Sequence, residues 1–255
     1  MAYNMEVLGV EIAERKFIRT AKNKKPSIID KKIEQYVPDN LEKTLMDTFE
    51  LAFRQIFQNG TSIISATFNK ARPEEAEEAI KKSKISGMVD TSVSFVTGTT
   101  MGILGVGLPD IPIFTAMVLR NVYQKAVTYG FDYKSRTEQI YILLLIKGAL
   151  TLGEEAETVS LQIDDYARRV DEDGMVNNTW LGDELDDAAN ALADNMLYMK
   201  FVQGIPIVGA AGGISNVVTM RKINKYADIK YHKREIRKAE HEAKLKQEMG
   251  AKQNG

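Results

Sequence analysis

The stretch GLPDIPIFTAMVLRNVYQKAVTYGFDY, residues 107–133, holds the signals for one complete buried helix. Asp110 is placed to cap the start of that helix, because its carboxylate can accept hydrogen bonds from the free N–H groups of the first turn. Pro112 falls in this first turn, where its missing N–H costs little. Gly130, directly after Tyr129, can adopt the left-handed conformation that ends many helices. Apolar residues lie on most sides of the cylinder between these ends, so we expect the helix in the interior of an all-α fold.

Most of the remaining chain has apolar residues at the three- and four-residue spacing of amphipathic helices. Strand signals are scarce, because no alternating run is bounded by hairpin dipeptides. Further helices are predicted at residues 39–58, 73–84, 137–151, 154–170 and 180–201. We therefore predict an all-α protein, a single multi-helix bundle with two central Gly-rich uncharged segments and a charged C-terminal helix.

The two segments without charged residues are 91–109 and 201–220, and each approaches the roughly 20 residues that a helix needs to cross a bilayer. Their Gly, Ser, Thr and Asn content makes transfer into lipid poorer than for a Leu-rich span, which disfavours a simple transmembrane pair. Two interpretations stay open: buried helices whose small residues allow close packing, and shallow or interfacial membrane segments. For the second interpretation, membrane contact is predicted at Phe201, Ile205, Pro206, Ile207, Val208, Lys222 and Lys225.

Charge is spread unevenly along a chain whose formal net charge is -1. Residues 151–195 contain thirteen acidic and two basic side chains, whereas residues 221–249 contain ten basic and five acidic ones. Because charge runs usually face water, we expect the first segment to form a solvated acidic face. The second segment predicts a long polar helix, either solvated along its length or bound through its basic excess to anionic lipid headgroups.

The residue content also argues against several kinds of chemistry. The chain has no cysteine, which excludes disulfides and thiolate metal sites, and its two histidines, His232 and His241, would lie on opposite sides of a helix. No phosphate-binding loop is present, and we predict neither a metal nor a cofactor. The acidic middle segment argues against nucleic acid as a partner. Glu6, Glu11 and Glu14 do not fit a secretory signal, so we expect a cytoplasmic location.

Arg120 is the one residue that an apolar helix does not explain. A guanidinium inside such a helix needs a partner, because burying it unpaired is costly. Asp110 lies about 15 Å away along the helix, so we expect the partner at Asp90 or in the acidic segment that follows Thr151. A structural ion pair is favoured over a ligand contact, and the alternative is a hydrolase or lipid-handling enzyme that uses Asp110, Arg120 and Tyr129.

A family resemblance rests on short motifs: Asp110, Pro112, Arg120, Tyr129, Gly130 and Asp132, together with IPIVGAAGGISN at residues 205–216. Over residues 73–227 the chain resembles the EcsC family of bacterial proteins, with Ile111 at a position where Leu is usual in that family. The family is named for a member encoded beside the two components of an ABC-type transporter system linked to protein secretion. It supplies no catalytic residues to carry over, so the motif residues are candidates for ligand contact only.

The resemblance implies a non-enzymatic, membrane-peripheral accessory protein at the inner face of the cell membrane. Its implied partners are an anionic membrane surface and components of an ABC-type transporter. Within one compact domain we expect three parts: an N-terminal helical region at 1–72, an EcsC-like helical domain at 73–227, and a charged tail at 228–255.

Overall fold

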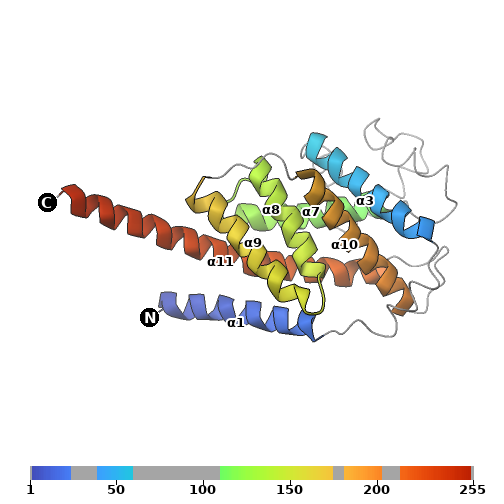
Figure 1. Cartoon of the computed structure of the whole chain (residues 1–255), viewed down its shortest axis with the longest axis horizontal. Coiled ribbons are helices and arrows are strands. Elements are labelled where there is room, and N and C mark those ends of the chain that lie inside the picture. Colours follow the sequence, from blue (N-terminus) through green and yellow to red (C-terminus); the bar gives the residue numbers. More distant parts are fainter. Residues whose placement is uncertain (1, 24–38, 60–109, 175–180, 203–212, 254–255) are drawn as a thin grey trace.

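The computed structural model describes residues 2–23, 39–59, 110–174, 181–202 and 213–253 (Figure 1). These ranges contain helices and no strand, which confirms the predicted all-α fold. The helices are α1 (Ala2–Lys22), α3 (Asp39–Asn59), α7 (Asp110–Thr128), α8 (Arg136–Leu150), α9 (Glu155–Glu172), α10 (Leu181–Val202) and α11 (Gly213–Gln253). Four of the predicted helices correspond to α3, α8, α9 and α10, with ends that differ by at most two residues. The predicted helix at 73–84 and the uncharged segment 91–109 lie outside the described residues.

α7 begins and ends where the sequence signals predict. Gly130 follows its last turn with φ +77, the left-handed conformation expected there. The N–H of Gly130 donates to the carbonyl of Val127 (3.1 Å), and the N–H of Phe131 donates to the carbonyl of Ala126 (2.8 Å). This pair of bonds is a Schellman motif, which satisfies carbonyl groups at the helix end that have no partner inside the helix. α7 packs against α3 and α11, as predicted for a helix with apolar residues on most sides.

α8 is buried on nearly all sides, between α9, α10 and α11 (Figure 1). Ser135 caps its start by accepting a hydrogen bond from the N–H of Glu138 (3.2 Å). Every residue from 140 to 146 is buried. Gly148 lies where three helices meet, and a Cβ at this position would stand 2.5 Å from Cδ1 of Ile163 and 3.0 Å from Cε1 of Tyr226. The missing side chain of Gly148 therefore lets α9 and α11 approach α8 closely.

α11 runs through the bundle, and its last turns extend beyond the other helices (Figure 1). α1 lies beside it although the two helices are at opposite ends of the sequence, and the ring of Phe17 packs on the ring of Tyr226 with centroids 4.8 Å apart. The prediction of a helix over 221–249 is confirmed. The expectation that this helix is solvated along its length is wrong, because Lys230 and Arg234 in its middle are buried. Its contact with anionic lipid stays a prediction.

None of the helices described here combines the length and the apolar character that crossing a bilayer requires. The second uncharged segment, 201–220, ends in described helix on both sides, in α10 and in α11, and its middle lies outside the described residues. α11 continues without a break through residue 227. The division of the chain at residues 72 and 227 stays a prediction.

Candidate functional site

The motif residues predicted as ligand contacts are distributed along α7 and do not converge. Asp110 is the first residue of this helix, Arg120 lies about 15 Å further along the axis, and Tyr129 follows the last turn, about 28 Å from Asp110. The side chains of Asp110 and Pro112 are outside the described residues, and Arg120 is half-buried. A single site that uses Asp110, Arg120 and Tyr129 together is therefore not formed within α7.

Tyr129 has a structural role at the end of α7. Its hydroxyl donates to Oδ1 of Asp228 (3.2 Å), and its ring stacks on His232 of α11 with centroids 5.4 Å apart. Burial and the charge of Asp228 raise the pKa of Tyr129 to about 12, so the hydroxyl stays protonated at neutral pH. Lys125 also pairs with Asp228 at 2.6 Å. These contacts tie the end of α7 to α11.

Some of the residues predicted to touch a membrane lie outside the described structure. They are Ile205, Pro206, Ile207, Val208 and the side chain of Phe201. Lys225 is exposed at the start of α11, and Lys222 is half-buried and has an interaction partner. Lys225 shares one side of α11 with three other exposed residues. We call these four residues the 217–225 face: Val217, Val218, Arg221 and Lys225.

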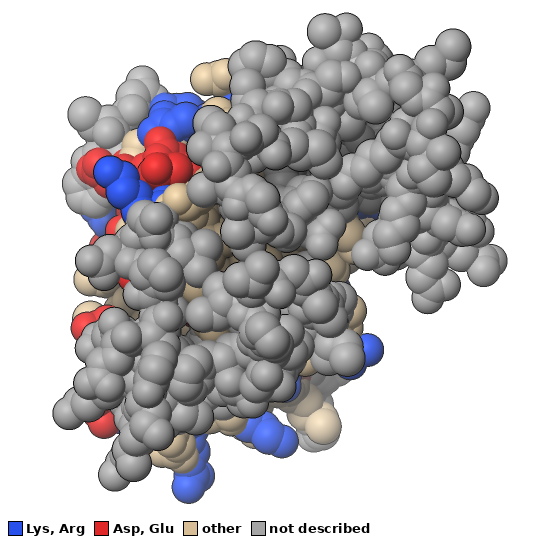
Figure 2. All heavy atoms as spheres, turned by 90° about the vertical axis from the view of Figure 1, so that its right-hand side faces the viewer, with Lys and Arg blue, Asp and Glu red and all other residues tan. Residues whose placement is uncertain are grey.

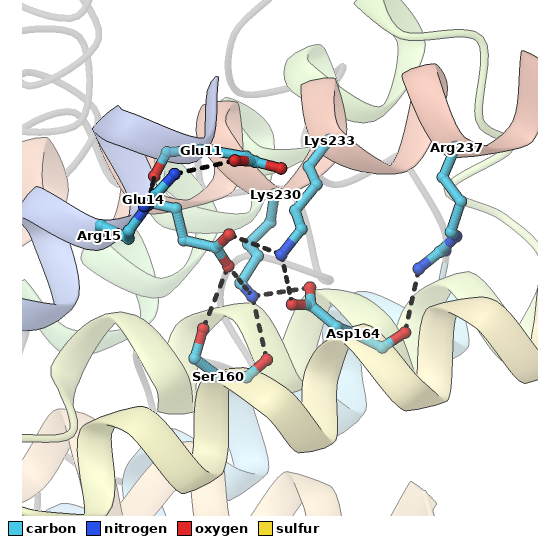
Figure 3. A network of polar contacts seen from close by, with 8 residues as sticks. All are labelled: Glu11, Glu14, Arg15, Ser160, Asp164, Lys230, Lys233 and Arg237. Atoms are coloured by element: carbon cyan, nitrogen blue, oxygen red, sulfur yellow. Dashed lines mark hydrogen bonds and ion pairs between the residues drawn. The ribbon is translucent and has the colours of Figure 1, made fainter. Parts of the chain in front are cut away.

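The polar cluster that the sequence analysis missed lies on the inner side of α11. Lys230, Lys233, Arg234 and Arg237 recur there at helical spacing and meet carboxylates from three other helices. We call this set the α11 ion-pair network. Its carboxylates are Glu14 of α1, Glu138 of α8, and Asp164, Asp171 and Glu172 of α9. Figure 3 shows the half of the cluster around Lys230 and Lys233.

Lys230 occupies the centre of one half of this network, and its side chain is fully buried (0% exposed). Its ammonium group donates to Glu14, to Oδ1 of Asp164 (2.7 Å) and to the main-chain carbonyl of Ser160 (3.0 Å), which uses all three of its hydrogens. Lys233 bonds the second oxygen of each carboxylate, at 2.6 Å for Glu14 and 2.7 Å for Asp164. Two lysines and two carboxylates thus alternate in a closed arrangement, visible in Figure 3.

The charge of Lys230 determines the ionisation of Glu14. Burial alone would raise the pKa of Glu14, but the charge and the hydrogen bond of Lys230, assisted by Lys233, lower it below its usual value. Glu14 therefore stays ionised at neutral pH. The pair stabilises the folded state above the usual pKa of a glutamate, and this stabilisation is lost as the pH falls through the lowered value.

Arg234 occupies the centre of the other half and is almost fully buried (4% exposed). Its guanidinium donates to both oxygens of Glu138 (3.0 and 2.9 Å) and to both oxygens of Asp171 (2.7 and 2.8 Å). The rings of Phe131 and Tyr141 cover it, with centroids 4.1 and 4.4 Å from its central carbon. Two bidentate hydrogen-bonded carboxylates and two stacked aromatic rings form an environment that suits a buried guanidinium.

The environment of Glu138 depends on Arg234. Burial raises the pKa of Glu138, while the charge of Arg234 and hydrogen bonds from Tyr231 (2.7 Å) and Arg234 act in the opposite direction. For the cation Arg234, burial acts in the other direction and would lower the pKa. Its hydrogen bonds to Asp171 and the charge of Glu138 outweigh burial and raise the pKa of Arg234. Each charge in this half is thus stabilised by an opposite charge in contact with it.

The network as a whole sets four cations against five carboxylates. Because these charges already satisfy one another, the chemistry they support is the attachment of α11 to α1, α8 and α9 rather than the binding of a charged ligand. Among the residues that the structure describes, no three metal-ligating side chains gather in one place.

The network also changes the interpretation of the uneven charge distribution. Asp164 and Asp171 belong to the acidic segment 151–195 and neutralise cations of the basic segment 221–249. With the four network cations paired internally, six basic residues of the second segment remain against five acidic ones. A spacing of three, four and seven among the basic residues from Lys230 to Arg237 was the signal in the sequence, and it would have predicted one charged helix face.

The chain is similar in sequence to known proteins of one family. The model of the EcsC protein family matches residues 6–236, a span that includes most of α1 and the part of α11 with Lys230, Lys233 and Arg234. Protein EcsC from Bacillus subtilis (strain 168) is 22% identical over 236 residues, covering 92% of this chain and 92% of that protein. The uncharacterized protein YdbA of the same strain is 25% identical over 228 residues, with 82% of each chain covered. No solved structure matches the chain.

Proposed function

The chain belongs to the EcsC protein family, and from this premise we propose that it is a non-enzymatic, membrane-peripheral accessory protein. It acts on the cytoplasmic side, at the inner face of the cell membrane. Its partners are anionic lipid and components of an ABC-type transporter or of a protein secretion system. The link to a transporter rests on the family resemblance, and the membrane contact rests on a surface of α11.

The observation that carries the membrane proposal is the 217–225 face. Val217 and Val218 are large apolar residues with 44% and 46% of their surface exposed, and Arg221 and Lys225 follow one and two turns later. This face begins inside the uncharged segment 201–220. Apolar side chains beside basic ones suit the boundary between acyl chains and anionic headgroups, where each Lys or Arg contributes about 1 kcal/mol of attraction.

The internal pairing of Lys230, Lys233, Arg234 and Arg237 restricts this proposal to the start of α11. The middle of the helix has no free basic excess to offer a membrane. Arg221 and Lys225 lie before the network, next to the valines, and Lys225 is exposed. The lipid-binding surface we propose is therefore short and local.

Vesicle flotation tests this proposal. We expect the protein to float with phosphatidylglycerol vesicles at low salt, to float less at high salt, and not to float with neutral phosphatidylcholine vesicles. Replacing Arg221 and Lys225 by Glu should abolish the binding. Replacing Lys244 and Lys246 by Glu makes the same change of charge on exposed residues of the same helix, beyond the bundle, and should leave the binding intact. Absence of flotation under all conditions would refute the proposal.

The transporter link needs a separate measurement. We expect the wild-type chain to co-purify from bacterial membranes with an ABC-type ATPase or its membrane subunit. The Arg221→Glu and Lys225→Glu variant tells whether this association requires lipid contact. Recovery of neither component, while flotation succeeds, would leave a membrane-peripheral protein that has no role at such a transporter.

A further inference from the structure

A second exposed apolar surface lies on α1, at the opposite end of the sequence from the 217–225 face. Met5, Leu8 and Ile12 have 71%, 52% and 53% of their surface exposed. Their spacing of three and four residues puts the three side chains on one side of the helix. Large apolar side chains that gather in this way on a protein surface mark an interaction site more often than scattered ones do.

The orientation of α1 is fixed by contacts on its other side. Val10 and Ala21 are buried, Phe17 packs on Tyr226, and Glu14 bonds Lys230 and Lys233 of α11. Rotating the helix to bury its apolar side would break this part of the α11 ion-pair network. Met5, Leu8 and Ile12 therefore stay on the outside of the bundle.

The same side of α1 becomes basic toward its C-terminal end. Arg15, Lys16 and Arg19 are exposed, and Arg15 pairs with Glu11 at 2.9 Å. Figure 2 shows Lys and Arg side chains along the lower edge of the molecule, the edge on which α1 lies in Figure 1. We call Met5, Leu8, Ile12, Arg15, Lys16 and Arg19 the α1 outer face.

The two exposed faces are connected through the core. Phe17, between Lys16 and Arg19 in sequence, contacts Tyr226, which directly follows Lys225 of the 217–225 face. The basic end of α1 therefore lies next to the basic start of α11. The contact between Phe17 and Tyr226 lies on the inner sides of both helices and brings the C-terminal half of α1 level with the start of α11.

We propose that the α1 outer face is a second membrane contact, in which α1 lies in the plane of an anionic bilayer. Met5, Leu8 and Ile12 enter the boundary between headgroups and acyl chains, and Arg15, Lys16 and Arg19 bind lipid phosphates. This inference rests on the proposed function and names the helix through which the protein binds. A second copy of the chain fits less well, because a symmetric contact would bring the same three cations to the interface, and three side chains bury far less than the roughly 1,200 Å² of a stable complex.

A fluorescent probe on α1 distinguishes this inference from the broader proposal. The chain has no cysteine, so Leu8→Cys provides a single attachment point for a nitrobenzoxadiazole label. We expect its emission to shift to shorter wavelength on phosphatidylglycerol vesicles. The matched control is Lys43→Cys, an exposed residue of α3, and its emission should not shift. The helix α3 lies across the bundle from α1 in Figure 1.

Each result of the flotation and labelling experiment supports or overturns the inference about α1. Flotation without a shift at Leu8 would overturn the α1 inference and leave the 217–225 face as the membrane contact. Absence of flotation would overturn both proposals. A shift that occurs without vesicles and grows with protein concentration would show that a second copy covers this face, and would overturn the lipid inference.

A serine variant gives an independent measurement. Replacing Met5, Leu8 and Ile12 by Ser should weaken partition onto the vesicles by about tenfold or more, because these side chains supply the apolar part of the contact. The matched control replaces Val127 and Leu161 by Ser, two large apolar residues that are exposed on α7 and α9, and should not change partition. Equal partition of both variants and the wild type would overturn the inference.

Discussion

α7 and α11 both contribute to the core of the bundle, but for opposite reasons. α7 is an apolar helix whose burial follows from its composition. Of its few charged residues, Asp110 is at its start, and Arg120 and Lys125 are half-buried. α11 is rich in charge, yet its middle is buried because Lys230 and Arg234 meet carboxylates on α1, α8 and α9. The difference shows that a charged helix can be an interior helix when its charges are paired and hydrogen-bonded.

The largest effect is expected from Arg234→Ala in α11. The substitution leaves Glu138 and Asp171 buried without their guanidinium, which should lower the free energy of unfolding by about 3–5 kcal/mol. Denaturant unfolding followed by circular dichroism measures this loss. Lys246→Ala, on the exposed end of the same helix, is the control and should change stability by about 0.5 kcal/mol or less. Equal stabilities of the two variants would contradict the role assigned to the network.

A smaller effect is expected from Arg120→Ala in α7. Arg120 is half-buried rather than enclosed, so its own charge keeps access to water, and we expect a loss of about 1–2 kcal/mol. The same unfolding measurement compares it directly with Arg234→Ala. A loss as large as that of Arg234→Ala would mean that α7, like α11, depends on a buried paired charge. Unchanged stability with loss of a cellular function would instead point to a ligand contact.

Gly148 tests the close approach of α9 to α8. A methyl group at this position would stand 2.5 Å from Cδ1 of Ile163, so Gly148→Ala should overpack the contact. Part of that cost is offset by the better helix propensity of alanine, and we expect a net loss of about 1 kcal/mol.

The matched control for Gly148 is Ile163→Val, which removes the Cδ1 atom in question. We expect the double variant to be more stable than the sum of the two single losses predicts, because the new methyl group fills the space that Cδ1 leaves. Additive losses in this double-mutant cycle would mean that Ile163 does not limit the approach of the helices.

The smallest effect is expected where a carboxylate faces another carboxylate instead of a cation. Burial and the charge of Glu42 raise the pKa of Asp194 on α10 from 3.8 to about 6. The folded protein thus holds this proton more tightly than the unfolded chain does, and the stability it contributes at low pH is lost as the pH rises from 4 through 6. Asp194→Asn should raise stability at pH 7, by about 0.5–1 kcal/mol because the side chain is partly exposed, and should give no gain at pH 4.

Thermal unfolding at pH 4 and pH 7 measures this difference. Asp183→Asn removes the same charge from an exposed position of α10 and is the control. A gain in the Asp194 variant that is equal at both pH values would rule out the titration of Asp194 as its cause.

The sequence predicts the apolar and capped helices of this fold well. Asp110, Pro112 and Gly130 mark α7, and the apolar spacing of α3 and α8 gives their ends to within two residues. These signals are local, because a cap or an apolar stripe depends on neighbours a few residues away. Gly130 shows this, since its left-handed conformation was predicted from its place after Tyr129 alone.

The inner side of α11 could not be predicted in the same way. The burial of Lys230 depends on Glu14, 216 residues earlier, and the burial of Arg234 depends on Glu138, 96 residues earlier. The sequence analysis predicted a helical region at 1–72, but not that α1 packs on α11, because that contact depends on Glu14 pairing with Lys230 and Lys233. Pairing between distant segments is a property of the fold, and no window of the sequence contains it.

The position of the network along the chain has a consequence for biosynthesis. Glu14, Glu138, Asp164 and Asp171 are all translated before the cations of α11 that neutralise them. Until α11 has left the ribosome, these carboxylates have no network partner and α1 has no surface to dock on, so the bundle can close only late in synthesis. A product that terminates before residue 230 would leave these carboxylates exposed to water and the bundle unclosed. Such a chain would be cleaved readily by cellular proteases.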